Sequence, residues 1–206
     1  MLIAVKLPPM PLARPLKPGL VTRYRAESEW NGRSGSATYR YGLVFTVAKY
    51  KGERPEFVDV GVRMENLAMT QNGESVPRVK LAGAFMLQMQ PSGPPMGLFL
   101  AGKAAALGLP LVAWYLPPAV AREFEVPEMP IDSNVTATGT GRLIAMGGGY
   151  VKVFYDLGIG PSGVPLADRA MKFRATSTIH LRTGVLEAVE GSVVEPGGNL
   201  TFRIVR

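Results

Sequence analysis

The chain contains no cysteine and a single histidine among its 206 residues. The absence of cysteine excludes disulfide bonds, thiolate metal sites and cysteine nucleophiles. With His180 as its one imidazole, the sequence also argues against histidine-rich zinc sites and against most serine–histidine catalytic triads. We therefore expect no metal ion and no enzymatic activity.

Charged residues and long hydrophobic runs are also scarce. Charged residues make up 19% of the chain, and the longest apolar run, residues 96–118, is interrupted by Gly102, Lys103, Gly108 and Pro110. Such a run is a poor membrane span, so we expect none. The formal net charge of +7 can attract an anionic partner, but a charge away from zero also simply keeps many proteins in solution.

Glycine and proline, by contrast, are abundant, with 24 and 18 residues spread without a period. Long helices tolerate neither residue well, so this composition favours many turns and short elements, as in a mostly β protein. Apolar and polar residues alternate with period two in two blocks, residues 19–90 and 132–206, which is typical of strands with one buried face. The clearest alternation runs from Met171 to Arg182.

A proline-rich and apolar segment, residues 91–131, separates the two strand blocks. Its alanine-rich part predicts one short helix over 98–109, with Gly108 as a C-terminal cap. A short extended stretch is expected over 111–116. Two prolines predict an irregular or edge segment over 124–131.

We predict one mainly β domain over residues 1–206, because neither strand block has an obvious flexible linker of its own. The expected architecture is a curved antiparallel sheet or an open half-barrel, with one short helix and the apolar middle segment plugging its apolar face. Two separate domains are disfavoured on the same ground.

Residues 158–163, Gly-Ile-Gly-Pro-Ser-Gly, match the G-x-G-x-x-G pattern of dinucleotide-binding loops. That chemistry requires a helix directly after the loop, whose N-terminal amides and dipole meet the pyrophosphate. Pro161 lies inside the loop and Pro165 follows it closely, so no helix fits before the next strand. We expect an interstrand loop and no cofactor. The glycines at 147–149 are expected to form a hairpin turn with positive φ.

Four basic residues are expected on one face of the strand over 171–182, namely Lys172, Arg174, His180 and Arg182. Such a stripe can bind an anionic surface, and Arg203 would join it if its strand were adjacent. The alternative is an ordinary solvated sheet face, which also discourages edge-to-edge aggregation. That face has no aromatic residues to stack on bases, which argues against nucleic acid.

An apolar ligand is the other candidate partner. Aromatic side chains and ten methionines provide the material to line a lipid-sized cavity, since methionine adapts to ligands of different shape. The candidate aromatic residues are Trp30, Phe85, Phe99, Trp114 and Tyr115. The alternative is that these residues belong to an ordinary hydrophobic core.

The first 19 residues are proline-rich, and their apolar start is short and lacks a basic region before it. They therefore do not make a complete signal peptide. Two interpretations stay open: the remnant of a truncated leader, or a proline-rich segment that lies along the domain.

Two short stretches resemble uncharacterised bacterial envelope proteins built on long antiparallel strands: KPGLVTRY at Lys17–Tyr24 and TGVLE at Thr183–Glu187. The order of elements is also similar in outline to lipoprotein-carrier folds, in which a curved half-barrel covers an apolar pocket. The resemblance implies a location in the cell envelope or outside the cell. The chain has no lipobox cysteine, so a cytoplasmic location stays open. The resemblance implies no catalytic residues.

The sequence thus predicts a non-enzymatic envelope or secreted protein that binds an apolar or amphipathic ligand or acts as a structural module. The alternative is an interaction protein that binds an anionic partner, such as a glycan, a lipid headgroup or a nucleic acid, on its basic sheet face.

Overall fold

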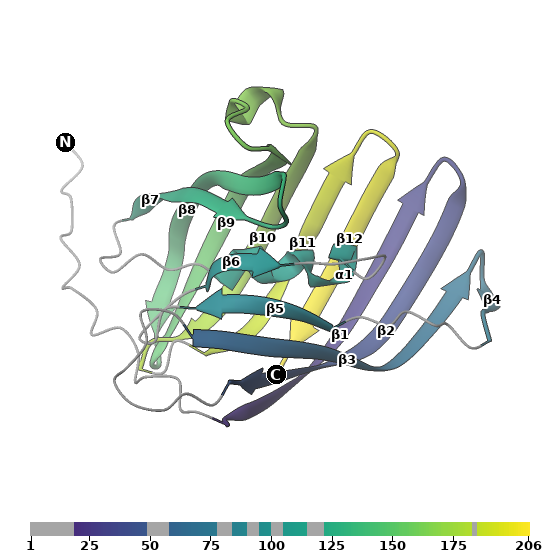
Figure 1. The fold of residues 1–206 in the computed structure, drawn as a ribbon, viewed down its shortest axis with the longest axis horizontal. Coiled ribbons are helices and arrows are strands. Elements are labelled where there is room, and N and C mark those ends of the chain that lie inside the picture. The colour runs from purple at the N-terminus through teal and green to yellow at the C-terminus, as the bar shows by residue number, and fades with distance from the viewer. Residues whose placement is uncertain are drawn as a thin grey trace.

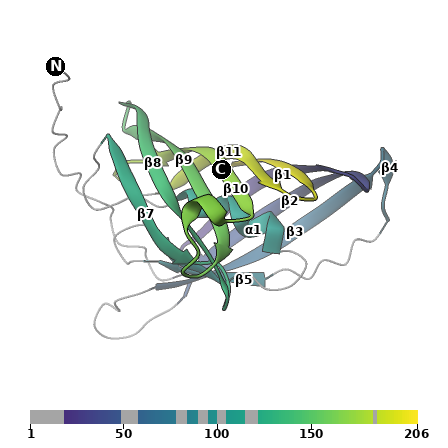
Figure 2. The same cartoon turned by 90° about the horizontal axis from the view of Figure 1, so that it is seen from above.

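The computed structural model describes residues 19–48, 58–77, 84–89, 95–99, 105–114, 122–182 and 185–206. They form one antiparallel sheet that curves around a short helical segment, as Figures 1 and 2 show from two directions. This confirms the prediction of a mainly β fold with a curved antiparallel sheet and a short helix.

The strands are β1 (Val21–Gly32), β2 (Gly35–Val47), β3 (Val58–Gln71), β4 (Glu74–Ser75), β5 (Ala84–Met89), β6 (Pro95–Phe99), β7 (Glu123–Pro130), β8 (Val135–Gly147), β9 (Tyr150–Pro161), β10 (Met171–His180), β11 (Leu186–Glu195) and β12 (Gly198–Val205). The helical segments are α1 (Ala105–Gly108) and the 3-10 helices η1 (Leu109–Trp114) and η2 (Leu166–Asp168). The order across the sheet is β6-β5-β3-β2-β1-β12-β11-β10-β9-β8-β7, with β4 on β3. The edge strands β6 and β7 contact each other, but the described residues form no hydrogen-bonded pairing between them, so the sheet stays open.

Period-two alternation builds this sheet as the sequence predicts. Phe173 and Ile179 of β10 and Val151 of β9 are fully buried, while residues between them point to the opposite side. We call the side with the buried side chains the inner face and the other side the outer face. Gly148 (φ 60°) and Gly149 (φ 83°) form the hairpin turn between β8 and β9, as predicted. One hydrophobic core cluster draws on strands from both blocks.

Of the middle segment, residues 105–114 pack on the inner face, whereas 95–99 and 123–130 are strands of the sheet. Residues 98–99 belong to β6 and not to the helix expected over 98–109, of which α1 accounts for four residues. Residues 111–114, expected to be extended, are helical in η1, and 115–116 lie outside the described residues. All six residues of η1 are buried, and a run buried on every side has no period from which to tell helix from strand. β7 is an edge strand, as its prolines predict.

The loop predicted over 158–163 is wrong in its first half, because Gly158 to Pro161 continue β9. The side chains of Leu166 and Arg169, which follow β9 in the sequence, pack against Gly158. A Cβ atom on it would come within 2.6 Å of Leu166 Cδ1 and 3.0 Å of Arg169 Cδ. Glycine at this position lets two side chains pack closely on the strand.

Candidate functional site

Residues 105–114 cover the inner face of the curved sheet, and we call this segment the plug. It consists of α1 and η1, and η1 contacts β6, β10 and β11. Every residue from Leu107 to Trp114 is buried. Figure 2 shows the helical turn of α1 within the curve of the sheet.

Two hydroxyl groups of the sheet hold the plug near its two ends. The Tyr41 hydroxyl in β2 donates to the carbonyl oxygen of Leu107 at 3.0 Å, and Ser177 Oγ in β10 donates to the carbonyl oxygen of Ala113. Ser28 Oγ lies 3.1 Å from the Tyr41 hydroxyl. Burial raises the pKa of Tyr41 to about 12, so the group is protonated and able to donate at neutral pH. The inner face therefore combines an apolar surface with a few buried hydroxyls.

Ser177 is a site residue that the local sequence pattern alone could have indicated. It takes an inner position in the otherwise apolar alternation of β10 and is fully buried. A buried polar group normally has a hydrogen-bond partner, so a serine at such a position signals one. The partner itself is 64 residues away and leaves no trace in the local sequence.

The indole of Trp114 packs edge-on against Phe45, with 5.8 Å between the ring centroids. A cavity of about 20 Å³ lies beside these two rings and reaches Tyr24 in β1. That volume has room for about one water molecule rather than a lipid chain. The buried Tyr24 hydroxyl has no hydrogen-bond partner in the part of the chain that the structure describes, and burial raises its pKa above the ordinary value.

The two tryptophans predicted to line a cavity do not lie together. Trp114 packs on Phe45, which pairs with Thr22 at the start of β1. Trp30, which is partly buried against the core, lies eight positions further along β1. At about 3.3 Å per residue, these two positions on β1 are roughly 25 Å apart.

The other aromatic candidates lie at the border of the described structure. Phe85 and Phe99 belong to the paired strands β5 and β6, where Phe99 stands opposite Met86. Their side chains, and the whole of Tyr115, lie outside the described residues. A cavity lined by these five residues therefore stays a prediction.

The predicted basic stripe follows β10, but local partners engage its first half. Lys172 Nζ donates to two carbonyl oxygens of η2 at 2.8 and 3.3 Å. Arg174 forms an ion pair with Asp156 of β9 at 3.2 Å. His180 packs edge-on against a tyrosine ring of β9, with 5.0 Å between centroids, and Arg182 is exposed in the turn after β10. Arg174 and Lys172 are therefore less available to an outside anion than the sequence suggests.

The outer face is hollowed where β12, β1 and β2 lie side by side, and we call this hollow the outer groove. Its volume is about 1010 Å³. Its floor includes Gly42, Val44 and Val205. Its charged lining, five arginines and two glutamates with a net formal charge of +3, consists of Arg23, Arg25, Arg40, Arg203, Arg206, Glu27 and Glu65. Arg203 thus lines this groove. It does not join the basic stripe on β10, because β11 lies between the two strands.

Ion pairs engage both glutamates of the outer groove and three of its five arginines. The pairs around it are Arg40–Glu27 at 2.8 Å, Arg63–Glu65 at 2.5 Å, Arg203–Glu190 at 4.0 Å and Arg206–Glu187 at 2.9 Å. Arg23 and Arg25 have no ion-pair partner among the residues that the structure describes. Across the sheet, Arg23 stands opposite Val44, and Arg25 stands between Gly42 and Val205. Their positive charge is therefore uncompensated.

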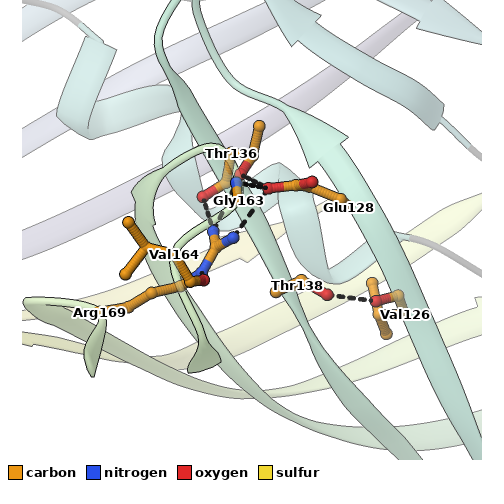
Figure 3. A network of polar contacts seen from close by, with 7 residues as sticks. All are labelled: Val126, Glu128, Thr136, Thr138, Gly163, Val164 and Arg169. Atoms are coloured by element: carbon orange, nitrogen blue, oxygen red, sulfur yellow. Dashed lines mark hydrogen bonds and ion pairs between the residues drawn. The ribbon is translucent and has the colours of Figure 1, made fainter. Parts of the chain in front are cut away.

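A buried arginine joins the strands at the other edge of the sheet (Figure 3). Arg169 is 3% exposed and donates to Thr136 O and Oγ1, to Val164 O and to Glu128 Oε1 at 2.8–3.0 Å. Glu128 also accepts from Thr136 Oγ1 at 2.6 Å and from the Gly163 amide at 3.1 Å. The hydrogen bonds from Thr136 and then from Arg169 lower the pKa of Glu128 to about 2. The acceptors of Arg169 are atoms of β7, β8 and the segment after β9, so the network ties these three parts of the chain together.

No family model matches the chain, and no curated protein matches it. A crystal structure from Bacteroides fragilis, described as a candidate exported protein with a YmcC-like fold, aligns with 94% of this chain and 96% of its own. Its sequence identity is 10% and its TM-score is 0.33, a likeness too low to carry an inference. In the described part of the chain, no group of three acidic or histidine side chains could hold a metal ion. The helices described are also too short to cross a membrane.

Proposed function

We propose that this is a non-enzymatic envelope or secreted protein whose inner face takes up an apolar or amphipathic ligand in exchange for the plug. The proposed location rests on the resemblance of its sequence to envelope proteins. The ligand proposal rests on one observation: a single short segment, residues 105–114, lies over the apolar inner face, with η1 buried throughout.

Such a segment is suited to displacement. Helices of the 3-10 type have poor hydrogen-bond geometry, and α1 adds only four residues to the six of η1. Each of the two hydroxyl bonds to the plug contributes about 1 kcal/mol net. The buried apolar side chains of η1 make non-directional contacts, which an alkyl chain can replace. The hydroxyls of Tyr41 and Ser177 would then be available to a polar group of the ligand.

The chain has two tryptophans, which makes plug displacement measurable. Trp30→Phe leaves Trp114 as the reporter on the plug, and Trp114→Phe leaves Trp30 as a matched reporter on the sheet. We expect titration with laurate, below its micelle concentration, to shift the emission of Trp114 to longer wavelength as the indole leaves its buried site. The emission of Trp30 should stay unchanged.

Native mass spectrometry of the purified wild-type chain addresses the natural ligand. Co-purification of a lipid, with release of that lipid by laurate, supports the proposal. If no lipid co-purifies and saturating laurate leaves the emission of Trp114 unchanged, ligand exchange is excluded and the role of a structural module is left. Cell fractionation with antibodies against the chain tests the proposed location independently.

A further inference from the structure

Ion pairs leave the charges of the outer groove unevenly compensated. Its two glutamates are already paired with arginines, whereas Arg23 and Arg25 have no carboxylate partner in the described residues. Both are exposed and lie on the same side of β1, two residues apart. Two positions on one strand face are separated by about 7 Å, so both guanidinium groups can reach one small anion.

The hollow itself follows from the residues opposite these arginines. Arg25 stands opposite Gly42, which has no side chain, and Arg23 stands opposite Val44. The register between β2 and β3 shifts next to Gly42, and Asn66 on the facing strand has a positive φ of 52°. Such a bulge bends the strand and re-aims its side chains. An open, partly apolar floor on the neighbouring strands therefore flanks the two arginines, which have no carboxylate partner among the described residues.

We propose that the outer groove binds a phosphate group through Arg23 and Arg25. A guanidinium offers two parallel donors, and one such fork satisfies both oxygens of a carboxylate. A phosphate group presents further oxygens and can accept from two forks at once, so a pair of unpartnered arginines suits it better than it suits a carboxylate. The groove is separate from the inner face, so this site stands whether or not the plug is displaced.

The test uses the full chain, with inorganic pyrophosphate as the probe in isothermal titration calorimetry at low salt. We expect the double variant Arg23→Gln and Arg25→Gln to lose affinity by at least about tenfold, because two charge-assisted contacts are removed. The matched control, Arg174→Gln with Arg182→Gln, removes the same charge from the outer face of β10 and its following turn. It should change the affinity by no more than about twofold, through long-range charge alone.

A second pair of variants adds a carboxylate to the outer face and keeps both arginines. Gly42→Glu places a carboxylate beside Arg25, and a Cβ at this position makes ordinary contacts, the nearest at 3.6 Å, so the chain should fold. Gly61→Glu is the matched control, since a Cβ there meets nothing nearer than 3.9 Å and Gly61 lies outside the groove. Gly42→Glu should abolish pyrophosphate binding, whereas Gly61→Glu should retain it.

Vesicles of phosphatidylcholine, with and without phosphatidylglycerol, distinguish the source of the phosphate. Binding of pyrophosphate that depends on Arg23 and Arg25 indicates a soluble phosphate ester. Sedimentation with phosphatidylglycerol vesicles alone, with the same dependence on these arginines, indicates a lipid headgroup. The proposal is overturned if neither probe binds at low salt, or if the β10 control loses as much affinity as the groove variant.

Discussion

Arg169 and Arg174 form a natural pair for testing what a buried ion pair contributes to this sheet. Each arginine has one carboxylate partner, Glu128 at 2.8 Å and Asp156 at 3.2 Å respectively. The side chain of Arg169 is 2% exposed, whereas that of Arg174 is 66% exposed. We predict that Arg169→Met destabilises the protein strongly and that Arg174→Met leaves its stability nearly unchanged.

The expected magnitude follows from the acceptors that Arg169 leaves behind. Methionine keeps an unbranched stem over Gly158 and Gly160, so the packing on β9 is largely preserved. The substitution removes the ion pair with Glu128 and the hydrogen bonds to Thr136 Oγ1 and to the carbonyl oxygens of Thr136 and Val164, of which Thr136 is buried. Each buried acceptor without a partner costs about 1–3 kcal/mol, so a loss of roughly 2–4 kcal/mol is expected. For a chain of this size that corresponds to a fall in Tm of roughly 5–15 °C.

The assay is urea and thermal unfolding followed by circular dichroism, with both variants measured beside the wild type. Arg174→Met removes an exposed ion pair, whose contribution is about 0–1 kcal/mol, so its Tm should fall by about 3 °C or less. Equal shifts for the two variants would show that burial does not decide the contribution of these arginines. A shift below about 2 °C for Arg169→Met would refute the reasoning outright.

Three further predictions concern the same edge of the sheet and the plug. The pKa of Glu128 is held at about 2, below its ordinary 4.5, so its carboxylate adds stability above pH 4.5 that is lost as the pH falls towards 2. The Tm of Glu128→Gln should therefore be lower than that of the wild type at pH 7, and the two Tm values should converge near pH 2. The pKa of Tyr41 is raised to about 12, so the stability that its protonated hydroxyl contributes below pH 10 is lost as the pH rises from 10 to 12. In urea unfolding over this pH range, the free energy of unfolding should therefore fall less in Tyr41→Phe than in the wild type. Gly158→Ala, whose Cβ would meet atoms at 2.6 and 3.0 Å, should cost about 1–3 kcal/mol in chemical unfolding. Gly160→Ala, with its nearest contact at 3.3 Å, should cost clearly less, and equal losses would contradict the packing argument.

The strands could be predicted because burial on one side leaves a period of two in the sequence. The alternation expected over 171–182 matches β10, and the hairpin around residues 147–149 forms where its glycines indicate. The plug could be located but not assigned a conformation, because six consecutive buried residues in η1 leave no alternation to interpret. In the glycine pattern at 158–163, the first four residues belong to β9, and only the three-residue 3-10 helix η2 lies between it and β10. The extended conformation of these four residues depends on side chains that pack against them and could not be foreseen.

The outer groove could not be predicted for a different reason. It depends on the pairing of β1 with β12, which sets Arg25 opposite Val205, a residue from the other end of the chain. The local sequence does not show which strand pairs with β1, because the alternation of apolar and polar residues is the same for every possible partner. Arg203 would join the basic stripe only if its strand were next to β10, and the strand order places β11 between them. Long-range order, and not residue type, decides which arginines gather.

The proposed exchange on the inner face favours an amphipathic ligand over a pure hydrocarbon. When the plug leaves, the hydroxyls of Tyr41 and Ser177 lose their carbonyl acceptors, although Ser28 Oγ stays 3.1 Å from the Tyr41 hydroxyl. A buried hydroxyl left without a partner costs about 1–3 kcal/mol, which an alkane cannot offset. The Tyr24 hydroxyl has no hydrogen-bond partner among the described residues even with the plug in place, so a ligand with a polar group that reaches it would gain a contact that the plug does not make. The arrangement of hydroxyls thus selects a ligand that carries a hydrogen-bonding group on an apolar body.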